Sequence, residues 1–178
     1  MTTSKAMEDQ GAAIPHLSKG EIADLRSDVD EAFAIAELIT EKVSVTAAEI
    51  KALAATPVAL IAAGGANTLI EFVSAAIRLV SGNEVLAEDV GGSNLAIKYT
   101  DDSGVQVSED IEMTNFITKG SNGNTNTRAK IDAIVDADAA VNAPLVLHNI
   151  GAGEITGNVS DDAVLEVYVS YKLHRSVS

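Results

Sequence analysis

Histidine and cysteine, which often bind metals or perform catalysis, are scarce in this sequence. The three histidines, His16, His148 and His174, do not share the close spacing of a helical zinc motif. Cysteine is absent, which excludes disulfides, thiolate metal sites and cysteine nucleophiles. We therefore expect no zinc site, and we interpret His148 as a hydrogen-bonded residue of a strand.

Two pairs of adjacent aspartates resemble calcium ligands only in composition. Neither Asp101-Asp102 nor Asp161-Asp162 is followed by the alternating oxygen ligands and the distal glutamate of a calcium-binding loop. Both pairs therefore predict turns. The acidic residues as a whole are too numerous to single out two carboxylates for hydrolysis.

The glycines and serines also lack the spacing of catalytic motifs. Gly151-Ala152-Gly153 does not fit the dinucleotide-binding pattern, and Gly64-Gly65 is not followed by the Lys-Ser/Thr of a phosphate loop. Three serines fall in predicted strands without the pattern of a nucleophile elbow, namely Ser74, Ser108 and Ser170. The sequence thus predicts no catalytic residue, no metal site and no cofactor, and we expect that the protein is not an enzyme.

Length and charge restrict the choice of partner. The chain has 178 residues, enough for one substantial domain, and its 12 basic and 26 acidic residues give a formal charge of −14. This charge repels phosphate backbones, so we expect no nucleic-acid partner. No apolar stretch is long enough to span a membrane and the first residues lack a secretory signal, so we expect a soluble protein with no membrane partner.

The N-terminal part predicts a flexible arm followed by a helix. Residues 1–17 are small and polar without periodicity, as in a segment that becomes ordered only on a partner. Ser18 and Glu21 form a capping box, and we assign the helix to residues 18–45. Within it, apolar residues recur at the alternating spacings of a coiled coil. The stripe expected to mediate oligomerisation is Ile22, Leu25, Val29, Ala32, Ala36, Ile39 and Val43. The alternative is an amphipathic helix that packs on the sheet of its own domain.

Residues 46–178 predict a β-sandwich domain. Thr46 and Glu49 form a second capping box, which predicts a short helix through Leu53. Gly120–Thr127 is expected to be a polar loop, and Ala129–Ala140 fits either helix or strand. Short strands without regular intervening helices favour a mainly β fold, an antiparallel, jelly-roll-like sandwich. The clearest expected strands are Val58–Ala62, Leu69–Val80, Leu95–Thr100, Val105–Glu112, Leu145–Asn149 and Val164–Leu173.

Five segments, taken in order, resemble a known family. They are HLSKGEIADLRSDVDEAFA from His16, IKALAATPVALIAA from Ile50, NLAIKYTDDSGVQVSEDIE from Asn94, APLVLHN from Ala143 and LEVYVSYKLH from Leu165. Together they resemble the capsid decoration, or cement, proteins of tailed bacteriophages.

The resemblance implies a non-enzymatic virion protein. It would be made in the host bacterial cytoplasm and would sit on the outer capsid surface as a homotrimer that bridges subunits of the major capsid protein. Two alternatives stay open. One is a head-fibre, tail or baseplate component, and the other is a glycan-binding β-sandwich, although the absence of tryptophan and the scattered aromatic residues weaken the latter.

Overall fold

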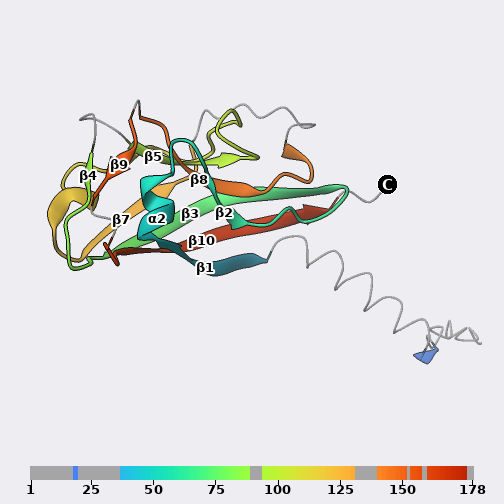
Figure 1. The fold of residues 1–178 in the computed structure, drawn as a ribbon. Helices are drawn as coiled ribbons and strands as arrows, with labels where there is room; N and C mark the ends of the chain where they lie inside the picture. The colour runs from blue at the N-terminus through green and yellow to red at the C-terminus, as the bar shows by residue number, and fades with distance from the viewer. Residues whose placement is uncertain are drawn as a thin grey trace, which may run out of the picture. The chain divides into compact units, whose positions relative to one another are not determined.

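The computed structural model describes residues 18–19, 37–88, 94–130, 140–151, 153–157 and 160–175. The chain divides into two units, Met1–Ala34, of which Ser18 and Lys19 are described, and Ile35–Ser178. The second unit contains two four-stranded antiparallel sheets that share one hydrophobic core (Figure 1). The predicted mainly β fold, an antiparallel sandwich, is confirmed.

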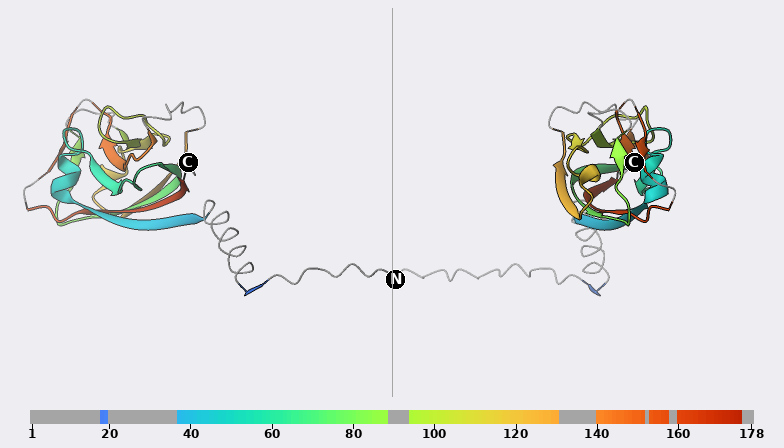
Figure 2. Two further views of the ribbon diagram at one scale, coloured as in Figure 1. Left: turned by 90° about the vertical axis from the view of Figure 1, so that its right-hand side faces the viewer. Right: turned by 60° about the vertical axis from the view of Figure 1, so that its left-hand side comes forward.

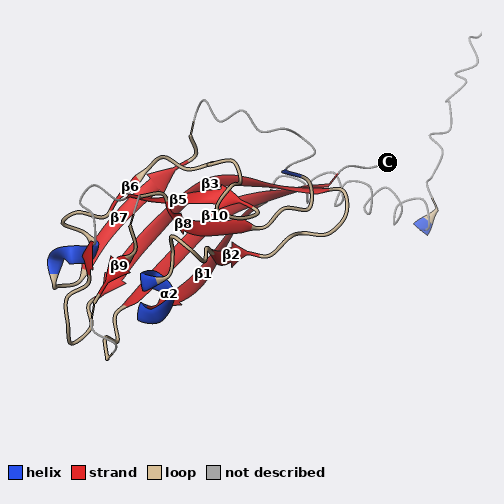
Figure 3. Cartoon of the chain, turned by 45° about the horizontal axis from the view of Figure 1, so that its top comes forward, coloured by secondary structure: helices blue, strands red, loops and turns tan. Residues whose placement is uncertain are grey.

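The described strands form two large sheets and one small one (Figure 3). Two short helical segments lie in the connections between strands. The first sheet contains, in spatial order, β1 (Leu38–Thr46), β10 (Val164–Arg175), β3 (Thr68–Val80) and β7 (Gly123–Arg128). The second contains β2 (Val58–Ile61), β8 (Leu145–Asn149), β5 (Asn94–Tyr99) and β6 (Ile111–Glu112). The remaining elements are β4 (Ala87–Glu88), β9 (Ile155–Thr156), helix α2 (Ala47–Lys51) and the 3-10 turn η1 (Ile117–Lys119).

The eight strands of the two large sheets form four nested antiparallel pairs. β1 pairs with β10, β2 with β8, β3 with β7 and β5 with β6, so the first half of the domain pairs with the second half in reverse order. Figure 2 shows β1, drawn in blue, beside β10, drawn in red. A long hairpin that curls over itself into two sheets gives this strand order, which is that of a jelly roll.

The alternation of apolar and polar residues explains the strands of the first sheet. In β10, Leu165, Val167 and Val169 are fully buried, whereas the residues between them point away from the core. This period of two places one face of the strand in the interior and the other outside. The predicted strand Val164–Leu173 is confirmed.

A buried hydrogen bond joins the two sheets across the core. The hydroxyl of Tyr99, on β5, donates to the backbone carbonyl of Ile70, on β3. Burial, with a smaller contribution from the charge of Glu71, raises the pKa of Tyr99 to about 12. The buried phenol is therefore held in its neutral form by its surroundings.

The helix predicted for residues 18–45 is wrong at its C-terminal end, because Leu38–Thr46 is strand β1. Ile39 and Val43 lie on this strand and pack against the core of their own domain, and they are not part of a helical stripe. The segment is rich in β-branched residues, and its nine-residue register with β10 outweighs the heptad spacing. The other five residues of the expected stripe, Ile22, Leu25, Val29, Ala32 and Ala36, lie outside the described residues.

The prediction of a polar loop at Gly120–Thr127 is also wrong, because most of this segment is strand β7. Gly120 closes η1 with a φ of 67°, and the chain then pairs with β3 from Gly123 onward. Asn124 and Asn126 are exposed, so an edge strand carries polar side chains here without burying them. Polarity alone therefore did not distinguish a loop from an edge strand.

The second predicted capping box is present and gives a first testable result. The amide of Glu49 donates to the Thr46 hydroxyl over 3.4 Å, and the amide of Thr46 donates to the Glu49 carboxylate over 2.8 Å. These contacts hold the pKa of Glu49 below its usual value, chiefly through the Thr46 backbone amide.

We expect Thr46→Ala to lower the free energy of unfolding by about 1 kcal/mol, as for other helix caps. Urea denaturation monitored by circular dichroism measures the change. Thr40→Ala on the same strand serves as the control. In the described part of the chain, the Thr40 hydroxyl has one hydrogen bond, an exposed one to the hydroxyl of Ser170, and it caps no helix. Equal midpoints for the two variants would contradict the capping role.

Candidate interaction surfaces

Two of the three histidines, His148 and His174, lie in different sheets. His148 is a residue of β8, as predicted, and is only 9% exposed. Its Nε2 lies 3.2 Å from the backbone oxygen of Ala54, while its buried Nδ1 has no hydrogen-bond partner. In the first sheet, His174 Nε2 lies 2.7 Å from Glu71 Oε2. His16 is outside the described residues.

The two aspartate pairs organise the backbone around them. Asp101 Oδ1 accepts hydrogen bonds from the amides of Ser103 and Gly104, at 2.9 and 3.1 Å, in the predicted turn after β5. Contacts with Ser103 lower the pKa of Asp101. Asp161 Oδ1 accepts from the amide of Ala163 at 2.8 Å and Asp162 Oδ1 from that of Asn83 at 2.7 Å. Within the described part of the chain, no three His, Asp or Glu side chains converge as metal ligands do.

No helix within the described ranges combines the length and the hydrophobicity needed to cross a membrane.

A groove of about 540 Å³ runs between helix α2 and the edge strand β2. In the connection between α2 and β2, the carboxylate of Glu154 accepts hydrogen bonds from the amides of Ala54 and Ala55 at 3.0 and 2.9 Å. Small side chains leave room there for an extended segment along the sheet edge. The groove is lined by Ala48, Glu49, Ala52, Thr56, Pro57, Val58 and Ala59.

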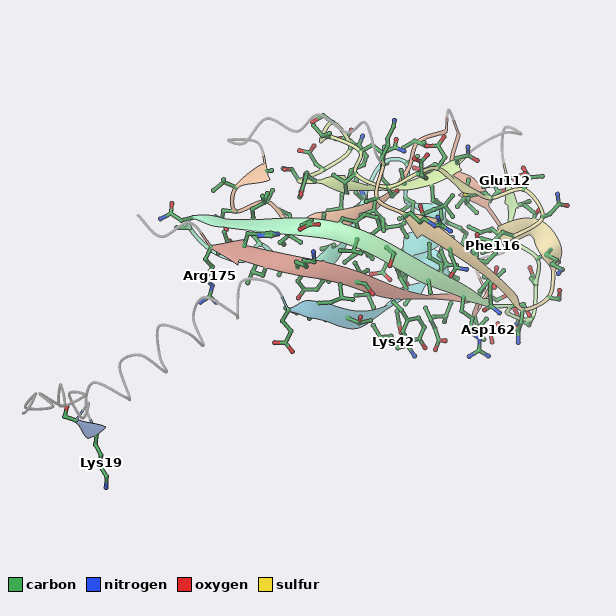
Figure 4. All side chains as sticks on the ribbon, turned by 180° about the vertical axis from the view of Figure 1, so that it is seen from behind. Lys19, Lys42, Glu112, Phe116, Asp162 and Arg175 are labelled. Atoms are coloured by element: carbon green, nitrogen blue, oxygen red, sulfur yellow. The ribbon has the colours of Figure 1, made fainter. Side chains whose placement is uncertain are left out.

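The outer face of the first sheet is the second surface of interest. The strand registers align outward-pointing side chains in rows across β1, β10, β3 and β7, and these side chains are mainly polar. Figure 4 shows the side chains of the domain, with Lys42 on β1 and Arg175 at the end of β10. Although the whole chain is acidic, four basic residues on this face, Lys42, Arg78, Arg128 and Lys172, accompany two acidic ones, Glu71 and Glu166.

Tyr168 lies near the centre of this face and is 36% exposed. The ammonium group of Lys42 lies 5.7 Å from the centre of its ring, within the range of a cation–π contact. Glu166 binds both neighbouring cations, with its oxygens 2.5 Å from Lys42 Nζ and 3.4 Å from Arg78 Nη1. The hydrogen bond to Lys42 holds the pKa of Glu166 below its usual value, so the carboxylate stays charged.

A hollow of about 240 Å³ opens beside Tyr168, on the side away from Lys42. The sequence analysis did not predict it, because the segment Gly120–Thr127, with Asn124 and Asn126, is expected there to be a loop. The alternation of Asn and Thr in Asn124–Thr127 was the available signal for an edge strand. The hollow is lined by Ala76, Ile77, Arg78, Asn124, Thr125, Asn126 and Tyr168.

Comparisons with known proteins do not assign the chain to a family. No protein-family model matches it, and no curated protein matches it. Among solved structures, it is similar to a chain from the cryo-EM structure of the semi-empty virus-like particle of the giant freshwater prawn (Macrobrachium rosenbergii) nodavirus. The identity is 11%, the match covers 80% of this chain and 95% of that chain, and the TM-score is 0.31. At that TM-score the similarity supports no conclusion about this chain.

Proposed function

We propose that this protein is a non-enzymatic virion component of a tailed bacteriophage, which decorates the outer capsid surface as a homotrimer and bridges subunits of the major capsid protein. The observation that carries the proposal is the jelly-roll strand order of the two sheets, β1-β10-β3-β7 and β2-β8-β5-β6. Viral capsid domains are among the proteins built on this fold. Because one fold serves many functions, the proposal also needs support from the surface and the charge.

The character of the described residues supports a binding role over catalysis. His148 and His174 lie in separate sheets, and Asp101 and Asp161 accept hydrogen bonds from backbone amides of their turns. A formal charge of −14 favours an outer position, because an inner capsid protein would lie against packaged DNA. The major capsid protein and further copies of this chain are the partners that we propose.

The N-terminal region supplies the proposed means of attachment. From the sequence pattern, we propose that residues 1–17 form an arm that binds the capsid. We propose that the apolar stripe from Ile22 to Ala36 mediates trimer formation. One arm would bind weakly, because ordering it costs conformational entropy. Three arms on one trimer act at high effective concentration and together give tight attachment.

Deletion of Met1–Ile14 is expected to leave trimers intact and to abolish attachment to capsids. Trimer formation is measured by light scattering, and attachment by co-sedimentation with purified phage capsids that lack this protein. Undiminished co-sedimentation would place the contact on the sandwich. A full-length protein that does not bind these capsids would overturn the decoration role itself.

The trimer has a separate test in the apolar stripe. Val29→Asp is expected to convert the trimer to monomers, because it places a charge in the proposed helical seam. Asp28→Asn, one residue earlier and outside the stripe, is the matched control and should remain trimeric. A wild-type protein that is monomeric at micromolar concentration would contradict this part of the proposal.

A further inference from the structure

We propose that the hollow beside Tyr168 on the outer face of the first sheet is a carbohydrate-binding site with a preference for acidic sugars. This surface is distinct from the N-terminal arm to which capsid attachment is assigned. The inference goes beyond the decoration role, and it rests on three neighbouring strands, β10, β3 and β7, whose residues together line the hollow.

The hollow exists because a small residue lies between larger ones. The registers align Lys42, Tyr168, Ala76 and Asn126 in one row across the sheet. Ala76 therefore forms the floor, with the Tyr168 ring on one side and the two asparagines of β7 on the other. Since Lys42 lies on the β1 side of Tyr168, the hollow on the β3 side remains open to a ligand.

The walls combine the groups that recognise a pyranose ring. An aromatic ring offers a flat apolar surface on which the C–H face of a sugar can pack. The carboxamides of Asn124 and Asn126 each provide donors and acceptors, which suits neighbouring hydroxyl groups. Small-molecule sites typically combine an apolar wall with a small number of polar groups that point toward the ligand.

The charge of the face selects among sugars. Arg78 lines the hollow, and its contact with Glu166 is long, at 3.4 Å, whereas Lys42 lies 2.5 Å from the same carboxylate. The guanidinium group therefore has donors available for the carboxylate of an acidic sugar, with which it can form a bidentate pair. The excess of basic residues on this face of an acidic protein favours the same ligand.

The ion pairs also prepare the site before a ligand arrives. Glu166 contacts Lys42 on one side of Tyr168 and Arg78 on the other, so the ring lies between two cationic side chains. Preorganised walls reduce the entropy lost on binding. The scarcity of large apolar side chains on this face argues against a protein partner, whose interface needs buried apolar anchors.

The test uses the full chain. Binding is first screened on an array of bacterial capsular and lipopolysaccharide glycans. Affinities are then measured by calorimetry with two acidic hexasaccharides, from alginate and polygalacturonate, and with two neutral ones, maltohexaose and cellohexaose. We expect an acidic glycan to bind, with at least a tenfold loss of affinity in Tyr168→Ala. We expect the same loss in Ala76→Leu, which fills the hollow.

The matched control is Ser44→Leu, which adds similar bulk to the same face but outside the hollow and should bind as the wild type does. All three positions are exposed, so the melting temperatures should stay close to that of the wild type. Failure to bind any glycan on the array, or binding unaffected by Tyr168→Ala and Ala76→Leu, would overturn the proposal. Loss of capsid attachment in Tyr168→Ala would also overturn it, by showing that this face contacts the capsid.

Discussion

Replacement of Leu165 by alanine is expected to lower the free energy of unfolding by about 3 kcal/mol. Leu165 is fully buried in β10, the strand that pairs with both β1 and β3, so its side chain lies in the shared core of the two sheets. The truncation removes apolar burial and leaves a cavity that the surrounding strands cannot fully close. Denaturation in guanidinium chloride, followed by circular dichroism at fixed protein concentration, measures the loss.

The matched control is the same substitution at Leu38. This leucine lies on the neighbouring strand β1 but is 54% exposed, so Leu38→Ala should change the stability by less than about 0.5 kcal/mol. A loss at Leu38 as large as that at Leu165 would show that another molecule covers Leu38 in solution. Equal and small losses would contradict the position of the core.

The second large effect is expected in alkali. The pKa of Tyr99 is raised from 10.0 to about 12 by burial, and burial together with a hydrogen bond to Glu41 raises that of Tyr171 to about 12. Each residue favours the neutral phenol in the folded state, so its contribution is complete below pH 10 and is lost as the pH rises to 12. For Tyr99 alone this amounts to about 3 kcal/mol, because one pKa unit corresponds to about 1.4 kcal/mol.

We expect the urea midpoint to fall steeply from pH 10 to pH 12 in the wild type and less steeply in Tyr99→Phe. At neutral pH that variant should lose only about 1 kcal/mol, the value of the hydrogen bond to the Ile70 carbonyl. The near-ultraviolet absorbance of tyrosinate reports ionisation directly. Ionisation of Tyr99 in the folded protein near pH 10 would contradict its buried, neutral state.

The parts of the fold that were predictable are those that local residues determine. The alternation in Val164–Leu173 indicated β10, and the Thr46–Glu49 capping box indicated α2, because a period of two and a helix cap each leave a signal within a few residues. Gly104 closes the predicted turn after Asp101, and a Cβ at that position would overlap the Tyr99 carbonyl oxygen, 1.6 Å away. Only glycine permits that approach.

The errors arose where distant strands decide the outcome. Ile39 and Val43 fit a heptad, but pairing with β10, far away in the sequence, makes their segment a strand. Asn124 and Asn126 are strand residues only because β3 provides the partner. The hollow beside Tyr168 needs the registers of β10, β3 and β7 together, and a single sequence gives no direct measure of those registers.

The nested pairing has a consequence for synthesis on the ribosome. β10 follows the other three strands of the first sheet in the chain, yet it lies between β1 and β3, and the hydroxyl contact of Thr40 with Ser170 joins residues 130 positions apart. Until β10 leaves the exit tunnel, β1 lacks its partner and β3 lacks one of its two neighbours, so both expose strand edges that can pair with other chains. The first sheet is therefore completed only after translation of β10, and the long-range contacts that it makes close slowly.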